Sequence, residues 1–333
     1  MENVQHGGAL DRAIATYGGK REEWLDLSTG INPNPYPVPI VPQYLWHRLP
    51  DENAMNDCLA AARSYYDVPG EGAIVAAPGT QALIQLLPQI SGAKKVWIVG
   101  PTYNEYERVF GSLAEVVVST ELPASVGDID LIVVGSPNNP DGRICDYAQL
   151  LALGKSIQTR GGFVLIDGAF GDVLSKDQAL LDATSENDGI VVFRSFGKFF
   201  GLAGLRLGFA IGAKSIIARF RTMLGPWAVS GPALYVGAQA LQDRSWIDAT
   251  KSSLGNKRSQ LENLLHGAGL DIVGATDLFV TTSHCESDVI AKSLALNHIL
   301  VRTFDYNPMW IRFGLPADDD GFVRLELALA QKR

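Results

Sequence analysis

Lys198 is the residue of this 333-residue chain best placed to act as a nucleophile. It lies in the segment FRSFGKFFGLAGLRLGF (residues 193–209), among glycines and aromatic side chains and directly after an apolar run at 190–193. Partial desolvation favours the neutral amine of a lysine, and a neutral amine can attack a carbonyl group. Taken alone, Lys198 could equally be an exposed lysine on a surface loop. The neighbouring motifs distinguish this interpretation from that of a nucleophile.

Polar and glycine-rich residues follow five short apolar runs that are typical of buried strands. The runs are 73–77, 95–99, 131–134, 163–166 and 190–193, and the residues that follow them are 78–80, 101–103, 136–140, 167 and 195–198. Ligands of parallel α/β sheets bind beyond the carboxyl ends of the strands. The sequence therefore predicts one binding site, built from several strand ends.

The chain shows two different patterns of expected helices and strands. From about residue 52 to 225, short β-branched runs alternate with amphipathic stretches, which predicts βαβ units and a mostly parallel sheet. Further strands are expected at 115–118 and 207–211, and helices at 52–66 and 81–91. Beyond 226, expected helices (226–244, 247–267, 321–330) and strands (278–282, 299–302, 310–313) form an α+β pattern. We predict a large domain over 40–225 and a small domain over 226–333, completed by the N-terminal arm 1–39 with a helix at 10–17.

The composition limits the classes of partner. The formal net charge is −8, which disfavours nucleic-acid and membrane surfaces but permits a small anionic substrate held by local arginines. Cys58, Cys145 and Cys285 are far apart, and neither they nor the histidines have metal-ligand spacing, so no metal site is expected. Without a secretory signal or a membrane-spanning apolar run, a cytoplasmic location is expected.

The lysine segment resembles that of the fold-type I enzymes that depend on pyridoxal 5′-phosphate (PLP). The pattern Ser/Thr-x-x-Lys-x5-Gly-x-Arg is matched by Ser195, Lys198, Gly204 and Arg206. The resemblance implies an α/β PLP-dependent transferase fold, with a mostly parallel sheet in its large domain and a smaller α+β domain. It also implies that Lys198 binds PLP covalently, while Ser195 and Arg206 bind the cofactor phosphate. A hydroxyl donor and a guanidinium fork suit a dianion.

Two further motifs of this resemblance concern the cofactor ring. Asp167, in the sequence Asp-Gly-Ala-Phe, is expected to pair with the pyridine nitrogen, which lets the ring accept electrons. Gly168 stands where the family usually has glutamate, and Phe170 lacks the phenol that many aminotransferases use at this position. Asn139, in the segment SPNNPDG (136–142), is expected to donate to the ring oxygen and to contact the substrate.

The remaining cofactor residues follow the first two strand ends. Gly79, Thr80 and Gln81 open a helix whose free N–H groups suit a phosphate, and the resemblance makes them its donors. Tyr103 is expected to stack on the PLP ring. Tyr106 is interpreted as a packing residue.

The two ends of the chain indicate the substrate. The segments HGG (6–8) and LDLSTGINP (25–33) resemble the threonine-phosphate decarboxylases, which implies that His6, Gly7 and Asn32 contact the substrate. Arg312 and Arg324 lie among apolar residues, where an unpaired charge is costly. The resemblance makes Arg312 a carboxylate-binding residue and Arg324 a second anion contact.

The implied reaction is the PLP-dependent decarboxylation of L-threonine O-3-phosphate to (R)-1-aminopropan-2-yl phosphate, a step of cobalamin biosynthesis, by a cytoplasmic homodimer. The alternative is a histidinol-phosphate or related class I/II aminotransferase, because the choice depends on which bond at Cα lies perpendicular to the cofactor ring. A non-catalytic DNA-binding regulator is disfavoured, since no basic segment flanks the fold. Leu49 replaces the tyrosine with which the family often reaches the partner's cofactor phosphate.

Overall fold

A computed structural model describes residues 7–70, 72–174 and 188–331. Contacts divide the chain into two compact units: unit 1 comprises the residues up to Asn34, Pro140–Gly142 and those from Asp248 onward, and unit 2 comprises Pro35–Asn139 and Arg143–Ile247. The predicted domain boundaries at 39/40 and 225/226 stay a prediction, because compact units defined by contacts need not coincide with folding domains.

A seven-stranded sheet in the order β2-β8-β7-β6-β5-β3-β4 forms the centre of unit 2. Only β8 runs against its neighbours, so the other strands end at the same edge. The strands are β2 Ala73–Ala77, β3 Lys95–Val99, β4 Glu115–Ser119, β5 Leu131–Gly135, β6 Phe163–Asp167, β7 Ile190–Ser195 and β8 Gly208–Gly212. These bounds agree closely with the expected strands, and the mostly parallel α/β sheet is confirmed.

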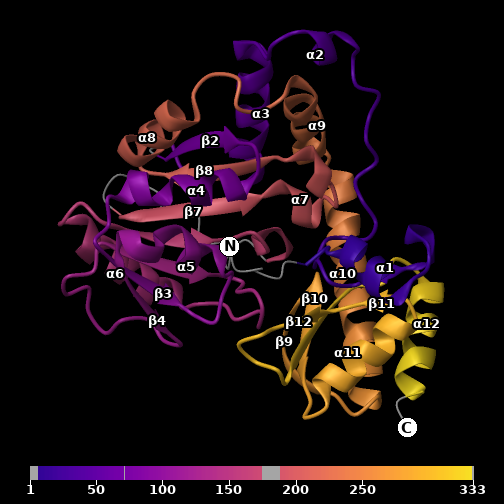
Figure 1. The fold of residues 1–333 in the computed structure, drawn as a ribbon. Coiled ribbons are helices and arrows are strands. Elements are labelled where there is room, and N and C mark those ends of the chain that lie inside the picture. Colours follow the sequence, from indigo (N-terminus) through magenta and orange to yellow (C-terminus); the bar gives the residue numbers. More distant parts are fainter. Residues whose placement is uncertain (1–6, 71, 175–187, 332–333) are drawn as a thin grey trace. The chain divides into compact units, whose positions relative to one another are not determined.

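Several helices of unit 2, among them α4, α5 and α8, pack against this sheet (Figure 1). The helices of the unit are α2 Tyr44–His47, α3 Glu52–Tyr65, α4 Thr80–Ser91, α5 Glu105–Phe110, α6 Tyr147–Gln158, α7 Phe196–Phe199, α8 Lys214–Leu224 and α9 Gly231–Gln242, with 3₁₀ turns at Gly111–Leu113, Gly171–Val173 and Ala203–Leu205. Apolar residues of α4, α5 and α8, including Leu87, Phe110 and Phe220, form one core with inward-facing strand residues such as Val133. This core fixes α4 and α5 against the sheet.

Unit 1 contains a four-stranded antiparallel sheet, β12-β13-β10-β9, and a parallel pair, β1-β11. Its strands are β1 Leu25–Asp26, β9 Asp271–Thr276, β10 Phe279–Ser283, β11 Ile299–Leu300, β12 Arg302–Thr303 and β13 Trp310–Gly314. Its helices are α1 Leu10–Tyr17, the 3₁₀ turn Arg21–Glu23, α11 Ser287–Leu296 and α12 Asp319–Ala330, and the boundary between the units falls within α10 Arg244–Gly267. Within the described ranges, no helix has the length and apolar character needed to cross a membrane.

Candidate active site

The first strand end of unit 2 forms a cradle around the start of α4. Gly79 precedes the helix with φ +81°, a left-handed conformation that suits glycine. A Cβ at Gly79 would lie 2.6 Å from Nη2 of Arg206, so the guanidinium group packs directly against this turn. A Cβ at Gly208 would lie 2.8 Å from the backbone nitrogen of Thr80. Because neither glycine carries a side chain, Arg206 and strand β8 can approach the first N–H groups of α4 closely.

Ser195 and Arg206 reach the same cradle from the end of β7 and from the turn before β8. Ser195 is the register partner of Gly208, which in turn is paired with Ala77 at the end of β2. Arg206 has a positive φ of 54° and donates from Nη1 to the carbonyl of Ala203 at 3.1 Å. The fold thus brings a helix N-terminus, a serine and an arginine together, a donor set suited to a phosphate dianion.

Asp167 lies at the carboxyl end of β6 and accepts two hydrogen bonds. The Tyr106 hydroxyl donates to Oδ2 at 2.7 Å, and the backbone N–H of Ala169 donates to Oδ1 at 3.0 Å. Burial raises the pKa of Asp167, and these two donors together with the positive charge of Lys198 oppose that rise. The carboxylate is therefore held in a fixed orientation, close enough to Lys198 for their charges to interact.

Tyr106 makes a contact with Asp167 that the sequence did not reveal. Its side chain is fully buried on α5, and its hydroxyl reaches Asp167 across the sheet edge. A buried tyrosine hydroxyl normally donates a hydrogen bond, so burial of Tyr106 would by itself have indicated that an acceptor lies nearby. No sequence pattern names that partner, because it comes from a strand 61 positions away.

Lys198 lies on the short helix α7 and is partly buried. Its Nζ atom is 5.6 Å from the centroid of the Phe170 ring, on the segment that follows Asp167. Gly168, where the family usually has glutamate, packs closely against the strand that leads to Lys198. A Cβ there would lie 3.0 Å from the carbonyl oxygen of Phe193 and 3.3 Å from Nη1 of Arg194. A side chain at position 168 would therefore require Phe193 and the buried Arg194 to shift by a few tenths of an ångström.

Asn138 ties two of the strand-end loops together. Its Nδ2 donates to the carbonyl of Pro101 at 2.9 Å, and its Oδ1 accepts from the Thr102 hydroxyl at 2.7 Å. The half-buried neighbour Asn139 is the residue predicted to contact the cofactor. Asn138 therefore fixes the loop of Asn139 against the one that carries Tyr103.

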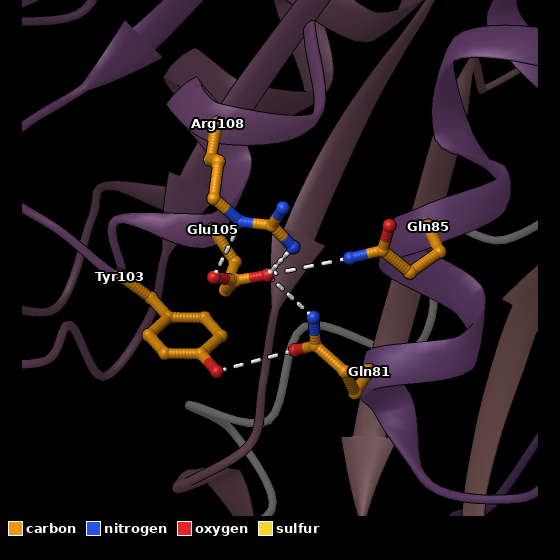
Figure 2. Close-up of polar contacts among 5 residues, drawn as sticks. All are labelled: Gln81, Gln85, Tyr103, Glu105 and Arg108. Atoms are coloured by element: carbon orange, nitrogen blue, oxygen red, sulfur yellow. Dashed lines mark hydrogen bonds and ion pairs between the residues drawn. The ribbon is translucent and has the colours of Figure 1, made fainter. Parts of the chain in front are cut away.

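A polar cluster joins Tyr103 to the start of α4 (Figure 2). The Tyr103 hydroxyl donates to Oε1 of Gln81 at 3.1 Å, and Nε2 of Gln81 donates to Oε2 of Glu105 at 2.6 Å. Glu105 also accepts from Gln85 and forms an ion pair with Arg108. The Gln81 side chain is therefore engaged within this cluster, and its contribution to a phosphate would come from its backbone N–H.

Residues of the N-terminal arm lie beside Arg312 in unit 1. Arg312 donates from Nη2 to the carbonyl of Ser28 at 2.7 Å. A Cβ at Gly7 would lie 2.5 Å from that same oxygen, and the N–H of Gly8 donates to the Ser28 hydroxyl. Asn32 is buried and accepts from the N–H of Asn34. The predicted residue His6 lies outside the described residues.

Two arginines face each other in this unit. Arg302 on β12 is the direct register partner of Arg312 on β13. Burial, and then the positive charge of Arg302, lower the pKa of Arg312 to about 10. The two guanidinium groups concentrate positive charge on one face of this sheet, which makes the pair a candidate anion site. Sequence reasoning missed Arg302 because a strand of two residues gives no periodic signal.

Arg324 has an environment different from the one expected. Its Nη2 atom donates to the carbonyl oxygens of Glu23, Asn297 and His298, at 2.6, 2.9 and 3.0 Å. These bonds tie α12 to the end of α11 and to the N-terminal arm. The geometry thus gives Arg324 a structural role, and its contact with a substrate anion stays a prediction without support from these contacts.

A profile of the family described as aminotransferase class I and II matches residues 51–321. The chain belongs to this family. It is 44% identical to a threonine-phosphate decarboxylase of Sinorhizobium sp over 98% of both chains, and 38% identical to one of Pseudomonas aeruginosa over 98% of this chain and 97% of that protein. A histidinol-phosphate aminotransferase of Chlorobium phaeovibrioides is 26% identical over 96% of this chain and 95% of that protein.

The fold is similar to that of solved aminotransferases. A histidinol-phosphate aminotransferase from Sinorhizobium meliloti, solved in complex with pyridoxal 5′-phosphate, superposes with a TM-score of 0.82 over 99% of this chain and 95% of its own, at 17% identity. One from Clostridium acetobutylicum gives a TM-score of 0.80 at 21% identity, over 92% and 98% of the two chains. At these identities the likeness confirms the fold alone.

Proposed function

We propose that this chain is a PLP-dependent threonine-phosphate decarboxylase, which converts L-threonine O-3-phosphate to (R)-1-aminopropan-2-yl phosphate for cobalamin biosynthesis. The observation that carries the proposal is identity of 44% and 38%, over almost the whole chain, to proteins of that name. The residues of both units are consistent with this chemistry.

The strand ends of unit 2 fit PLP in three respects. The cradle of Gly79, Thr80 and Arg206, with Ser195 beside it, suits the cofactor phosphate. Asp167, kept in place by Tyr106 and Ala169, suits a cationic pyridine nitrogen. A lysine amine at position 198 suits an aldehyde. When bound, the cofactor supplies a ring that accepts the electron pair of a breaking bond at Cα.

The proposed roles in unit 2 follow from these positions. Lys198 would hold the cofactor through its amine; once the substrate amine has displaced it, the freed Nζ would supply the proton that Cα takes up after CO₂ leaves. Asp167 would face the ring nitrogen. Tyr103 would stack on the ring, and Asn139 would donate to its oxygen and contact the substrate.

The arginine pair of unit 1 suits the substrate, which carries a carboxylate and a phosphate. Arg312 is proposed to bind the carboxylate, as the resemblance implies, with Arg302 adding positive charge beside it. Gly7 and Asn32, together with His6, are proposed substrate contacts on the N-terminal arm. Gly7 packs against the same Ser28 carbonyl that Arg312 binds.

Transamination is the alternative, in the manner of the histidinol-phosphate aminotransferases that are about a quarter identical to this chain. Phe170 cannot supply the hydroxyl that many aminotransferases use near the ring oxygen, which favours decarboxylation. We also propose that the enzyme is a cytoplasmic homodimer. Exposed apolar side chains on one segment support the dimer, notably Ile40 at 95% and Trp46 at 66% exposure.

A direct assay distinguishes the two reactions. Purified protein loaded with PLP is mixed with L-threonine O-3-phosphate, and released CO₂ and aminopropanol phosphate are measured. A parallel sample contains 2-oxoglutarate with histidinol phosphate, and glutamate is measured. We expect one CO₂ for each molecule of aminopropanol phosphate in the first sample, and little glutamate in the second. Glutamate formation without CO₂ would establish the aminotransferase instead.

A further inference from the structure

Glu105 is a buried carboxylate that the proposed reaction does not use. Only 3% of the residue is exposed, and it opens α5 two positions after Tyr103. Arg108 donates to it twice, from Nε to Oε1 at 2.8 Å and from Nη2 to Oε2 at 2.5 Å, so the carboxylate is ionised and its charge is balanced. Burying even a paired carboxylate costs free energy, and Glu105 also accepts hydrogen bonds from Gln81 and Gln85.

The charge of Glu105 fixes the direction of every hydrogen bond in the cluster. An ionised carboxylate can only accept, so the amide of Gln81 must turn its NH₂ group toward Glu105. The amide oxygen of Gln81 then faces Tyr103 and can only accept from the Tyr103 hydroxyl. Figure 2 shows this chain of contacts from Arg108 through Glu105 and Gln81 to Tyr103. The charge of Glu105 thus determines the orientation of the Gln81 amide, although Glu105 itself does not contact the Tyr103 hydroxyl in this chain of hydrogen bonds.

We propose that Glu105 is a positioning residue for the cofactor ring: it orients the Gln81 amide, which anchors the Tyr103 hydroxyl and thereby holds the Tyr103 ring where it stacks on PLP. This inference rests on the proposed PLP site. It adds a residue that neither binds nor touches the cofactor but determines how a stacking residue is held.

Other groups around Tyr103 are consistent with this role. Burial, followed by the negative charges of Glu105 and Asp167, raises the pKa of Tyr103 to about 12, so the hydroxyl keeps the proton that it donates. The Tyr103 ring packs edge-on against Tyr106, with centroids 6.3 Å apart. The hydroxyl anchor and the edge contact together leave the ring little freedom to rotate. A purely local function for Glu105, pairing with Arg108 within α5, would not require the Gln81 contact.

The test compares PLP affinity among apoenzyme variants, measured by fluorescence quenching, with the circular dichroism of the bound cofactor as a signature of ring orientation. Glu105→Gln and Tyr103→Phe should each raise the PLP dissociation constant about three- to tenfold, the effect of losing one hydrogen-bonded anchor. The double variant should be no worse than Tyr103→Phe alone, because both changes break the same path. Effects that multiply in the double variant, or an unchanged dissociation constant in Glu105→Gln, would overturn the inference.

Two glutamines of α4 give a matched pair in case Glu105→Gln does not fold. Gln81→Met removes the link to Tyr103 and should reproduce the effect of Tyr103→Phe. Gln85→Met also removes a donor to Glu105, at 3.3 Å, but leaves Tyr103 untouched, so its affinity for PLP should stay within about twofold of the parent. Equal losses in both methionine variants would contradict the proposed path.

Tyr103→Ala separates this inference from the proposed function. Loss of the ring should weaken PLP binding by about tenfold or more if Tyr103 stacks on the cofactor. An unchanged affinity in Tyr103→Ala would refute the stacking role itself, and with it the proposal for Glu105. A weakened Tyr103→Ala beside an unaffected Gln81→Met would refute only the positioning role.

Discussion

At the scale of single residues, the hydrogen bond from Tyr106 is the main contact that opposes the effect of burial on Asp167, the carboxylate proposed to face the ring nitrogen. Tyr106→Phe keeps the buried ring but removes a donor that opposes the effect of burial, so the pKa of Asp167 should rise. A carboxyl group with a higher pKa takes up its proton at higher pH. The acid limb of the pH profile of PLP binding should therefore move to higher pH in Tyr106→Phe, and affinity near neutral pH should fall about two- to tenfold.

The control for this variant is Tyr36→Phe. Tyr36 is also buried in unit 2, and its hydroxyl donates to a carboxylate, Oδ2 of Asp243, at 3.4 Å. Its loss should lower stability slightly and leave the pH profile of PLP binding unchanged. Besides Tyr106, the charged or titratable groups that act on Asp167 are Lys198 and Tyr103, and both are intact in either variant. A shared shift in the two profiles would show that Tyr106 has no specific effect on Asp167.

Individual residues could be assigned from the sequence where a motif fixes them and not where tertiary contacts do. Ser195, Lys198 and Arg206 share one motif, and the cradle does bring Arg206 to Gly79. The engagement of the Gln81 side chain by Glu105 depends on the packing of α5 against α4, which no local pattern encodes. The same holds for the space that Arg194 occupies beside Gly168.

At the scale of elements, the pairing of β12 with β13 places Arg302 opposite Arg312. Arg312→Gln should raise the Michaelis constant for threonine phosphate about ten- to hundredfold, the effect of losing a charge-assisted hydrogen bond. Because the pKa of Arg312 is lowered to about 10, its positive charge is lost as the pH rises through that value. Substrate affinity of the parent enzyme should therefore fall above about pH 10, measured by titration of threonine phosphate into protein that remains folded. Arg302→Gln should weaken binding in the same direction, and an unchanged Michaelis constant in both variants would contradict the anion site.

Arg324 provides the contrasting case among the arginines. Arg324→Met removes the donor to three carbonyl groups that hold α12, α11 and the N-terminal arm together. We expect the free energy of unfolding to fall by about 1–3 kcal/mol, with a Michaelis constant close to that of the parent. Denaturant melts and steady-state kinetics on the same preparation separate the two effects. A raised Michaelis constant at unchanged stability would instead support the anion contact that the sequence predicted.

Elements with strong periodicity were predictable, and short or exposed ones were not. The β-branched runs of the large sheet and helix Leu10–Tyr17 follow from pattern alone. Strand β9 was not expected, because Asp271 and Gly274 interrupt its pattern and much of it faces solvent. The expected strand at 299–302 is in fact two strands with different partners, β11 beside β1 and β12 beside β13.

At the scale of the whole molecule, the proposed homodimer makes a separate prediction. The segment of residues 38–49 exposes Ile40, Trp46 and Leu49, a cost that burial against a second copy would remove. Trp46→Asp should shift the mass measured by light scattering from dimer toward monomer, with little change in the helix signal of circular dichroism. A parent protein that is monomeric at micromolar concentration would contradict the proposal.

Every role proposed for this site depends on a covalent cofactor at Lys198, opposite Asp167. Borohydride reduction of the PLP-loaded enzyme, followed by proteolysis and mass spectrometry, identifies the lysine that carries the cofactor. We predict a single pyridoxyl adduct on the peptide that contains Lys198, and no adduct after Lys198→Ala. An adduct on another lysine, or none in protein saturated with PLP, would contradict the site proposed for this chain.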